Sequence, residues 1–451
     1  MSPSTPGKIQ PVVVPQRLFA WYLAAPERPV LVGELGRLNN GDASLHYAPA
    51  WLQAGFALSE DMPLRDQTYA PVHRRHREPA AAGALDDARP DRWGEKVIRY
   101  LYKRGATLMD HLYLAGDDRF GALGVSASGD AYLPFNRRPL PRLQDVPALA
   151  EVAAVIQSGE GELTAQRMQL AGAGGSLGGA KPKAVINIDG EAWVLKFFDG
   201  EPWDQPLIEH ACMALAHAAG VNVAQTRVIR LPTENAIAVR RFDRTAQGAR
   251  VHCVSASTLL RAATAPGEQP QYGYPHLARR LRAMGNVQRL DQDLQDLFRR
   301  MVFNILIGNT DDHEKNHAVM YELHNGAPVV KLSPAYDVVT SGSGAVHHEF
   351  MIADDVATPD LEAAISVHND FGLDEQPARE VVAQVVHMVD GWKARFTAQG
   401  VTAGDVEALA EFIDRDDLKA QRQRHRNPPP RTVAPARRQP KTGTPSIFRG
   451  R

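Results

Sequence analysis

The sequence predicts a two-lobed α+β fold, with a β-rich N-terminal lobe and an all-helical C-terminal lobe. Three observations lead to this fold class. Strand-like segments with tight-turn signals dominate the first half of the chain, one helix stands among them, and long runs of helical periodicity fill the second half. We expect the functional cleft between the two lobes.

Length and composition are those of a soluble protein with two or three domains. The chain has 451 residues, 44% of them apolar and 23% charged. No apolar run approaches the roughly 18 to 20 residues of a membrane-spanning helix, and the N-terminus lacks the pattern of a secretory signal. We therefore expect a cytoplasmic protein without a membrane partner. Cys212 and Cys253, the only cysteines, are interpreted as small buried hydrophobic residues.

The first half of the chain contains two hairpin signals. In VLVGELGRLNNGDASLHY, an Asn-Gly-Asp turn separates two alternating runs, and residues 17–135 resemble a small α+β unit after a flexible N-terminus of residues 1–16. In the second signal, AVINI and EAWVLKFF flank Asp189-Gly190, residue types that accept the positive φ angles of a type I′ turn. We expect an antiparallel hairpin at each place.

Helical periodicity follows the second hairpin. A helix is expected to begin near Pro206 and to end at Gly220, before a strand at residues 236–242. From Leu290 to Ile305, apolar residues recur at helical spacing, and residues 360–415 are helical in pattern again. Early strands and late helices are the basis of the two predicted lobes.

The stretch ILIGNTDDHEKNHAVMY, followed by VVKLSPAYDVV, carries the strongest chemical signal. Phosphoryl transfer needs a base that orients a hydroxyl group, oxygen ligands for magnesium, and cations on the phosphates. Asp311 and Asn316 are five residues apart, as are the Asp and Asn of the protein-kinase catalytic loop. Asp337 follows an apolar run 21 residues later, where a second metal-binding Asp belongs. The pattern favours Asp311 as the base.

Other residues of this region allow more than one interpretation. Asp312 and His313 compete for the role of the base, and His313 is a weak candidate for a metal ligand because no second His stands at a suitable offset. Lys315 either steadies the transferred phosphate or is an exposed loop lysine. The His347-His348 pair is interpreted as a surface turn.

A glycine-rich stretch, AGAGGSLGGAKPKAVI, leads into the second hairpin. It matches neither the P-loop nor the dinucleotide-binding pattern, since Ala180 follows Gly179. The stretch is either a flexible loop or a nest of N–H groups that binds an anion. Lys183 at its end and Lys196 on the next strand favour the anion site, because kinases hold ATP phosphates with a strand-borne lysine. Glu209 either pairs with Lys196 or is favoured by the helix dipole alone.

Four motifs together indicate a family: Ser176-Leu-Gly-Gly-Ala-Lys-Pro-Lys183, RFDR at 241–244, IGNTDDHEKN at 307–316 and LSPAYDVV at 332–339. In this order they resemble HipA, the kinase toxin of bacterial toxin–antitoxin modules, over about residues 17–415. The resemblance implies a two-lobed protein-kinase-like fold. Its parts would be an N-terminal subdomain at 17–135, an ATP-binding part at 150–245 and a helical catalytic lobe at 246–415.

The resemblance also assigns roles to residues. Asp311 falls on the catalytic base, Asn316 and Asp337 on the magnesium ligands, and Ser176 on the autophosphorylated serine. Residues around Arg240 and Phe242 fall on the hinge that lines the adenine pocket. The residues expected to contact ATP are Lys196, Gly178, Gly179, Ala180, Lys183, Arg240, Phe242, His313 and Lys315.

The family implies a serine/threonine kinase that uses ATP and Mg²⁺. Its expected substrate is an aminoacyl-tRNA synthetase of the glutamyl-tRNA synthetase type, and its expected partner is a HipB-like helix-turn-helix antitoxin that binds operator DNA. One alternative is a phosphotransferase that acts on a small molecule or a lipid head group with the same machinery. Another is a kinase-like binding module without activity, which the intact Asp311, Asn316, Asp337 and Lys196 disfavour.

Two features depart from the family pattern. The hinge of the family often has Glu where this chain has Arg240. The whole chain has a net charge of −1, yet residues 421–451 hold nine Lys or Arg and no Asp or Glu, which leaves the first 420 residues at −10. We expect residues 420–451 to form a disordered basic tail, either merely solvated or attracted to nucleic acid or an acidic partner.

Overall fold

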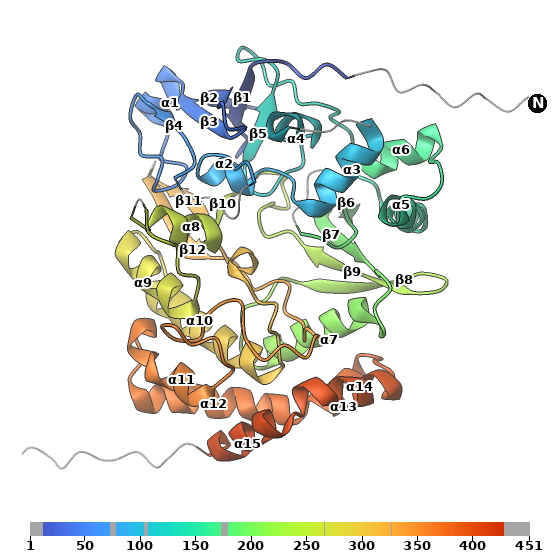
Figure 1. Cartoon of the computed structure of the whole chain (residues 1–451), viewed down its shortest axis with the longest axis vertical. Helices are drawn as coiled ribbons and strands as arrows, with labels where there is room; N and C mark the ends of the chain where they lie inside the picture. Colours follow the sequence, from blue (N-terminus) through green and yellow to red (C-terminus); the bar gives the residue numbers. More distant parts are fainter. Residues whose placement is uncertain are drawn as a thin grey trace, which may run out of the picture.

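The computed structural model describes residues 12–72, 78–102, 107–172, 179–265, 267–325 and 327–427. The molecule is elongated (Figure 1), with a sheet built from residues 18–126 at one end and the helices of residues 361–425 at the other. A second sheet lies beside the middle of the molecule. The predicted α+β class is confirmed.

The N-terminal subdomain is built on a five-stranded antiparallel sheet in the order β4-β3-β2-β1-β5. The first expected hairpin joins β2 to β3. The strands are β1 (Leu18–Tyr22), β2 (Val30–Arg37), β3 (Ala43–Tyr47), β4 (Thr68–Tyr69) and β5 (Leu123–Ser126). The helices are α1 (Pro49–Ala54), α2 (Ala84–Asp87), α3 (Arg92–Tyr102) and α4 (Leu108–Leu114).

The second sheet has four antiparallel strands in the order β6-β7-β9-β8. Its strands are β6 (Lys183–Ile188), β7 (Glu191–Phe197), β8 (Thr226–Arg230) and β9 (Asn235–Arg240), and the nearby helices are η1 (Leu143–Asp145), α5 (Val146–Ser158), α6 (Ala165–Ala171) and α7 (Gln205–Ala218). Asp189 and Gly190 have φ angles of 54° and 89°, which confirms the hairpin between β6 and β7. The Asp204 side chain caps α7, and Gly220 at φ 87° follows its end.

The C-terminal lobe is mainly helical, but the prediction of an all-helical lobe was wrong. Its three-stranded sheet, β10-β11-β12, consists of β10 (His252–Ser255), β11 (Ala318–His324) and β12 (Ala327–Leu332). These strands are short and apolar, so the periodicity of their sequences does not identify them as strands. Only their pairing shows that they form a sheet. The helices are α8 (Ala256–Ala262), α9 (Tyr274–Met284), α10 (Leu290–Leu306), η3 (Glu314–Asn316), α11 (Leu361–Ser366), η4 (His368–Phe371), α12 (Glu375–Asp390), α13 (Trp392–Ala398), α14 (Ala403–Ile413) and α15 (Asp416–His425).

The two largest hydrophobic cores among the described residues hold these parts together. The larger core runs without interruption from the N-terminal sheet to the C-terminal helices, so the two ends of the chain share one packed interior. The smaller core packs α3 and α5 against β6, β7 and β9. The N-terminal subdomain therefore contacts the second sheet through α3, and it shares the larger core with the helical lobe.

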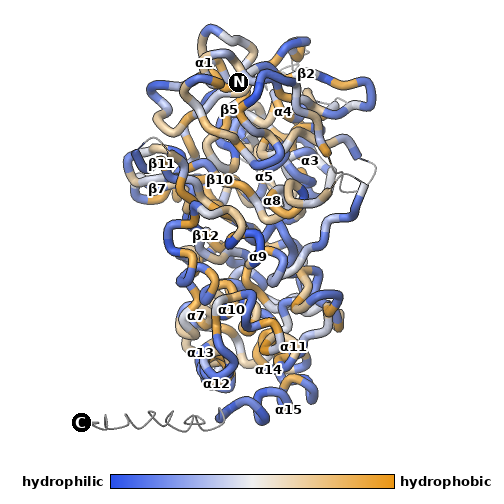
Figure 2. Tube along the Cα trace, turned by 90° about the vertical axis from the view of Figure 1, so that its left-hand side faces the viewer, coloured by the Kyte–Doolittle hydropathy of each residue, from blue (hydrophilic) through white to orange (hydrophobic). Residues whose placement is uncertain are grey.

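The polar helix α15 corrects the start of the predicted tail. It is largely hydrophilic (Figure 2), but Leu418, Arg422 and His425 are buried. Arg422 forms ion pairs with Asp390 and Asp414, so residues 420–425 belong to the folded lobe. The remaining tail, residues 428–451, lies outside the described residues.

Two smaller predictions concern membranes and thiols. Among the described residues, no helix combines the length and the apolar character that crossing a membrane requires. Cys212 and Cys253 are free and buried, as predicted.

Candidate active site

An ion triad links the second sheet, α7 and the loop after β12. The Nζ atom of Lys196 on β7 lies 2.7 Å from Glu209 Oε1 and 2.7 Å from Asp337 Oδ1. The side chains of Lys196 and Glu209 are 11% and 5% exposed, whereas that of Asp337 is 40% exposed. Burial acts to lower the pKa of Lys196, but the two carboxylates raise it above its usual value, so the lysine stays protonated. The predicted pairing of Lys196 with Glu209 is confirmed.

Asp337 occupies an unusual backbone conformation. Its φ angle of 58° lies in the left-handed region, which residues other than glycine adopt rarely and often at functional sites. The preceding Tyr336 donates a hydrogen bond from its hydroxyl to the Lys315 carbonyl, at 2.7 Å. This bond ties the Asp337 segment to the catalytic loop, here defined as residues 307–317.

The catalytic loop places Asp311 and Asn316 close together. Asp311 is exposed, while Asn316 is buried and donates through Nδ2 toward the Asp311 carbonyl at 3.4 Å. His313 caps the short helix η3, since its Nδ1 accepts from the Lys315 N–H at 3.2 Å. Partial burial and the nearby Glu349 and Asp337 raise the pKa of Asp311, against the effects of His313 and Lys181. A carboxylate with a raised pKa is a better proton acceptor.

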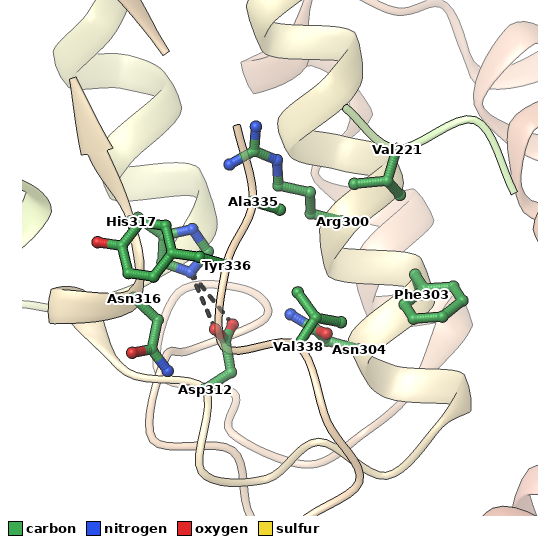
Figure 3. Close-up of a pocket in the computed structure, with 10 residues that line it drawn as sticks. All are labelled: Val221, Arg300, Phe303, Asn304, Asp312, Asn316, His317, Ala335, Tyr336 and Val338. Atoms are coloured by element: carbon green, nitrogen blue, oxygen red, sulfur yellow. Dashed lines mark hydrogen bonds and ion pairs between the residues drawn. The ribbon is translucent and has the colours of Figure 1, made fainter. Parts of the chain in front are cut away.

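Asp312 is a structural anchor, so its candidacy as the base was wrong. It is 2% exposed, lies 3.2 Å from His317 Nε2 and accepts a hydrogen bond from the Tyr274 hydroxyl. Figure 3 shows the Asp312 carboxylate pointing toward the His317 ring. Burial acts to raise the pKa of Asp312, but His317 and Tyr274 lower it below its usual value. His348 also faces Asp312 and is buried, so the surface turn predicted for the His pair holds only for His347.

A cavity of about 10 Å³ lies between α10 and the side chains of Asn316 and Tyr336 (Figure 3). Arg300, Asp312 and His317 are among its lining residues. This volume suits a single water molecule, not a nucleotide. The cavity is therefore part of the packing beneath the catalytic loop and is not the nucleotide site.

The end of the glycine-rich stretch lies beside a buried lysine. Gly179 has a φ angle of 85°, and a Cβ atom there would come 2.4 Å from Lys183 Nζ. Burial and the neighbouring Lys196 lower the pKa of Lys183 to about 8. The carboxylates of Asp337, Glu209 and Asp91 partly offset the repulsion between the two lysines, which face each other on paired strands and together form a cationic cluster. Ser176 and Gly178 lie outside the described residues, and Ala180 is exposed.

The expected hinge residues separate in the structure. The Arg240 guanidinium pairs with Glu191 and reaches Gln225 at 3.2 Å, away from the ion triad. The Phe242 ring centroid lies 5.3 Å from that of Tyr336, next to the Asp337 segment. Phe242 is thus near the site, whereas Arg240 stabilises the end of β9.

The RFDR motif forms a buried ionic network with the N-terminal subdomain. Arg241 and Arg244 each lie 2.9 Å from Asp118 Oδ1, and both also pair with Asp243. Burial acts to raise the pKa of Asp243, but the two guanidinium groups hold it well below its usual range. The motif joins the end of β9 to residues before β5, a structural role that its sequence alone did not indicate.

The oxygen donors present fit magnesium. Asn316 uses Nδ2 within the loop, which leaves its amide oxygen for a cation, and Asp337 bonds to Lys196 through one of its two oxygens. No group of three or more His, Cys, Asp or Glu side chains suited to a metal ion was found within the described ranges. Magnesium in phosphoryl-transfer sites typically takes one or two protein ligands and completes its shell with phosphates and water.

One residue near the site was missed in the sequence. Asp91, just before α3, pairs with Lys315 at 3.1 Å. Its sequence context is that of an ordinary residue before a helix, so no sequence signal singled it out.

Comparisons with known proteins identify the family of this chain. The model of the HipA N-terminal domain matches residues 28–126, and that of the HipA-like C-terminal domain matches residues 175–392. Together these matches cover more than two thirds of the chain.

Two proteins of Sinorhizobium fredii (strain NBRC 101917 / NGR234), both named as candidate kinases, are similar in sequence. Y4mE is 27% identical over 69% of this chain and 75% of its own length. Y4dM is 30% identical over 34% of this chain, a match that spans only 38% of Y4dM itself.

A solved structure shows the same fold. HipA of Shewanella oneidensis MR-1, solved with HipB and its operator DNA, superposes with a TM-score of 0.61 over 90% of this chain and 97% of its own, at 17% identity. With both HipA domain models matched and the kinase-like α+β architecture in place, the chain belongs to the HipA family.

Proposed function

We propose that the chain is an ATP- and Mg²⁺-dependent protein kinase that phosphorylates serine or threonine hydroxyl groups. The observation that carries this proposal is the double pairing of Lys196 with Glu209 and Asp337, beside Asp311 and Asn316. A strand lysine paired with a helix glutamate, a catalytic-loop Asp and Asn, and a later metal-binding Asp are the working parts of protein kinases.

The proposed reaction follows from these positions. Asp311 accepts the proton of the acceptor hydroxyl as its oxygen forms a bond to the γ-phosphorus, while the bond from that phosphorus to the β-phosphate oxygen breaks and ADP leaves. Lys196 and Lys183 hold the phosphates, and Lys315 supplies a cation beside the transferred group. Magnesium, bound by Asn316 and Asp337, would neutralise charge on the phosphates.

Family membership supports a role in a toxin–antitoxin module. The Shewanella HipA was solved in a complex with HipB and operator DNA. We infer for this chain a HipB-like antitoxin that binds operator DNA, a substrate of the glutamyl-tRNA synthetase type in the cytoplasm, and autophosphorylation at Ser176.

The kinase activity is tested with labelled ATP. The purified chain and the Asp311→Asn variant are each incubated with a cell lysate and with purified glutamyl-tRNA synthetase. We expect labelled protein with the wild type only. Equal labelling by both, or none by either, would refute the kinase assignment. Label found only in the small-molecule or lipid fraction would favour a phosphotransferase of another class.

Autophosphorylation has a separate readout. Intact mass after ATP treatment should show one added phosphate on the wild type and none on Ser176→Ala. A phosphate that persists in the variant would place the modification at another residue.

A further inference from the structure

Asp91 connects two parts of the chain that the two family models match separately. It lies directly before α3 in the N-terminal domain, and its Oδ2 atom is 3.1 Å from Nζ of Lys315 in the catalytic loop. The two side chains are 29% and 25% exposed, so the pair is substantially shielded from water. An ion pair in this environment fixes a lysine more firmly than one on the open surface.

The same segment also forms hydrogen bonds with the end of the glycine-rich stretch. The Gly179 N–H donates to the Asp91 carboxylate, and the Trp93 N–H donates to the Gly179 carbonyl at 3.0 Å. The Trp93 indole donates to the Lys183 carbonyl at 2.8 Å. Residues 91–93 therefore form a bracket between the glycine-rich stretch and the catalytic loop.

The bracket has a rigid base. Trp93 is 2% exposed and belongs to the smaller hydrophobic core, together with residues of β6 and β7. The Asp91 carboxylate also accepts from the Arg92 N–H at 3.0 Å, which orients it at the start of α3. The Asp91 carboxylate therefore has a defined position. The Lys315 side chain has four flexible methylene groups, so its ammonium group is fixed only when a partner binds it.

The charge of Asp91 is permanent at physiological pH. Burial acts to raise its pKa, but the Lys315 ammonium and the N–H groups of Arg92 and Gly179 hold that pKa well below the usual range. Asp91 thus presents a fixed negative charge to Lys315. It does not qualify as a phosphate ligand, since two anions repel each other.

We propose that Asp91 is a positioning residue, which holds Lys315 in a fixed relation to Gly179 so that both can act on a transferred phosphoryl group. The proposal rests on the kinase function proposed above. Lys315 then contributes mainly to the transition state, where correct placement of a cation affects turnover more than ground-state binding of ATP. Through Asp91, the N-terminal subdomain then helps to position a residue of the catalytic loop.

A double-mutant cycle tests this role. Asp91→Asn keeps the size of the side chain and an acceptor for Gly179 but removes the charge. We expect kcat to fall about tenfold with the KM for ATP unchanged within about twofold, and Asp91→Glu to recover part of the loss. In a Lys315→Ala background, Asp91→Asn should change kcat by less than about twofold, because the residue on which it acts is gone.

Asp110→Asn is the matched control. Asp110 is a buried carboxylate in the same subdomain, and it caps α4 through Thr107 instead of reaching the catalytic loop. This variant should leave kcat unchanged within about twofold, as expected for a helix cap. An equal loss from Asp91→Asn in both the wild-type and Lys315→Ala backgrounds would show that Asp91 acts only through the stability of α3, and would overturn the proposal.

Hydrogen exchange separates this inference from the kinase assignment. In the full chain without nucleotide, Asp91→Ala should accelerate amide exchange in peptides covering residues 179–183 and 311–317, whereas Asp110→Asn should not. If the wild type labels no acceptor but exchange accelerates, the kinase proposal fails and the structural tie stands. Unchanged exchange at both peptides would refute the tie itself.

Discussion

Replacing Lys196 with methionine should destabilise the protein as well as abolish phosphoryl transfer. Each 2.7 Å contact of Lys196 corresponds to about 6 kcal/mol of attraction at an effective dielectric constant of about 20. Desolvation of the buried charges offsets much of this attraction. Methionine fills a similar volume but leaves the buried Glu209 carboxylate without its cation, at a net cost of about 3 to 5 kcal/mol.

Lys181→Met is the matched comparison. Lys181 also lies 2.7 Å from a carboxylate, that of Glu201, but its side chain is 43% exposed. An exposed pair is worth about 0 to 1 kcal/mol, so this substitution should lower the melting temperature by no more than roughly 1 °C. Because the two lysines have equal ion-pair distances but differ in burial, the comparison isolates the effect of desolvation on stability.

Differential scanning calorimetry measures both variants. For a chain of this length, the loss expected for Lys196→Met corresponds to a fall in melting temperature of roughly 3 to 5 °C. Phosphoryl transfer should fall at least about 10²-fold, because the cation proposed to hold the phosphates is lost. A melting temperature no lower than that of Lys181→Met would refute the conclusion that Lys196 and Glu209 form a buried, stabilising pair.

Three further predictions concern single residues. Asp311→Asn should lower kcat by about 10² to 10⁴-fold while leaving the calorimetric Kd for MgADP within about twofold, since the base acts on the acceptor; a large change in Kd would contradict this role. Because the pKa of Lys183 is about 8, the lysine is charged below that pH, so affinity for ADP should weaken from pH 7 to pH 9. Lys183→Met should flatten this profile, and an unchanged profile would argue against Lys183. Asp312→Ala leaves buried partners unpaired and should cost about 2 to 4 kcal/mol, visible as a lower melting temperature, whereas Asp311→Ala should cost little. Equal losses would remove the distinction between anchor and base.

Local sequence signals predicted much of the scaffold. The type I′ turn at Asp189-Gly190 and the helix that ends before Gly220 both depend on neighbouring residues, and both were confirmed. The pairing of Lys196 with Glu209 was also accessible, because 13 residues separate them and the intervening strand and helix were recognised. Contacts between residues that are close in the sequence can therefore be predicted without a structure.

Contacts between residues that are far apart in the sequence could not be predicted in the same way. Asp91 and Lys315 are 224 residues apart, and neither carries a local mark of its partner. The RFDR motif was noticed, but its pairing with Asp118 depends on how two subdomains dock. The sheet in the helical lobe was missed partly for a related reason. β11 and β12 form a local hairpin, but the pairing of β10 with β11 joins segments that are far apart in the chain.

The adjacent residues Asp311 and Asp312 show how one short motif divides chemistry from support. The sequence offers two equivalent carboxylates, but the chain direction turns one toward solvent and the other into the core. Tyr274 and His317 stabilise the charge of Asp312, and the pKa of Asp311 is raised by partial burial and by nearby carboxylates. A base must take up a proton during the reaction, whereas an anchor must keep its charge. Their opposite pKa shifts therefore support Asp311 as the base, independently of its spacing from Asn316.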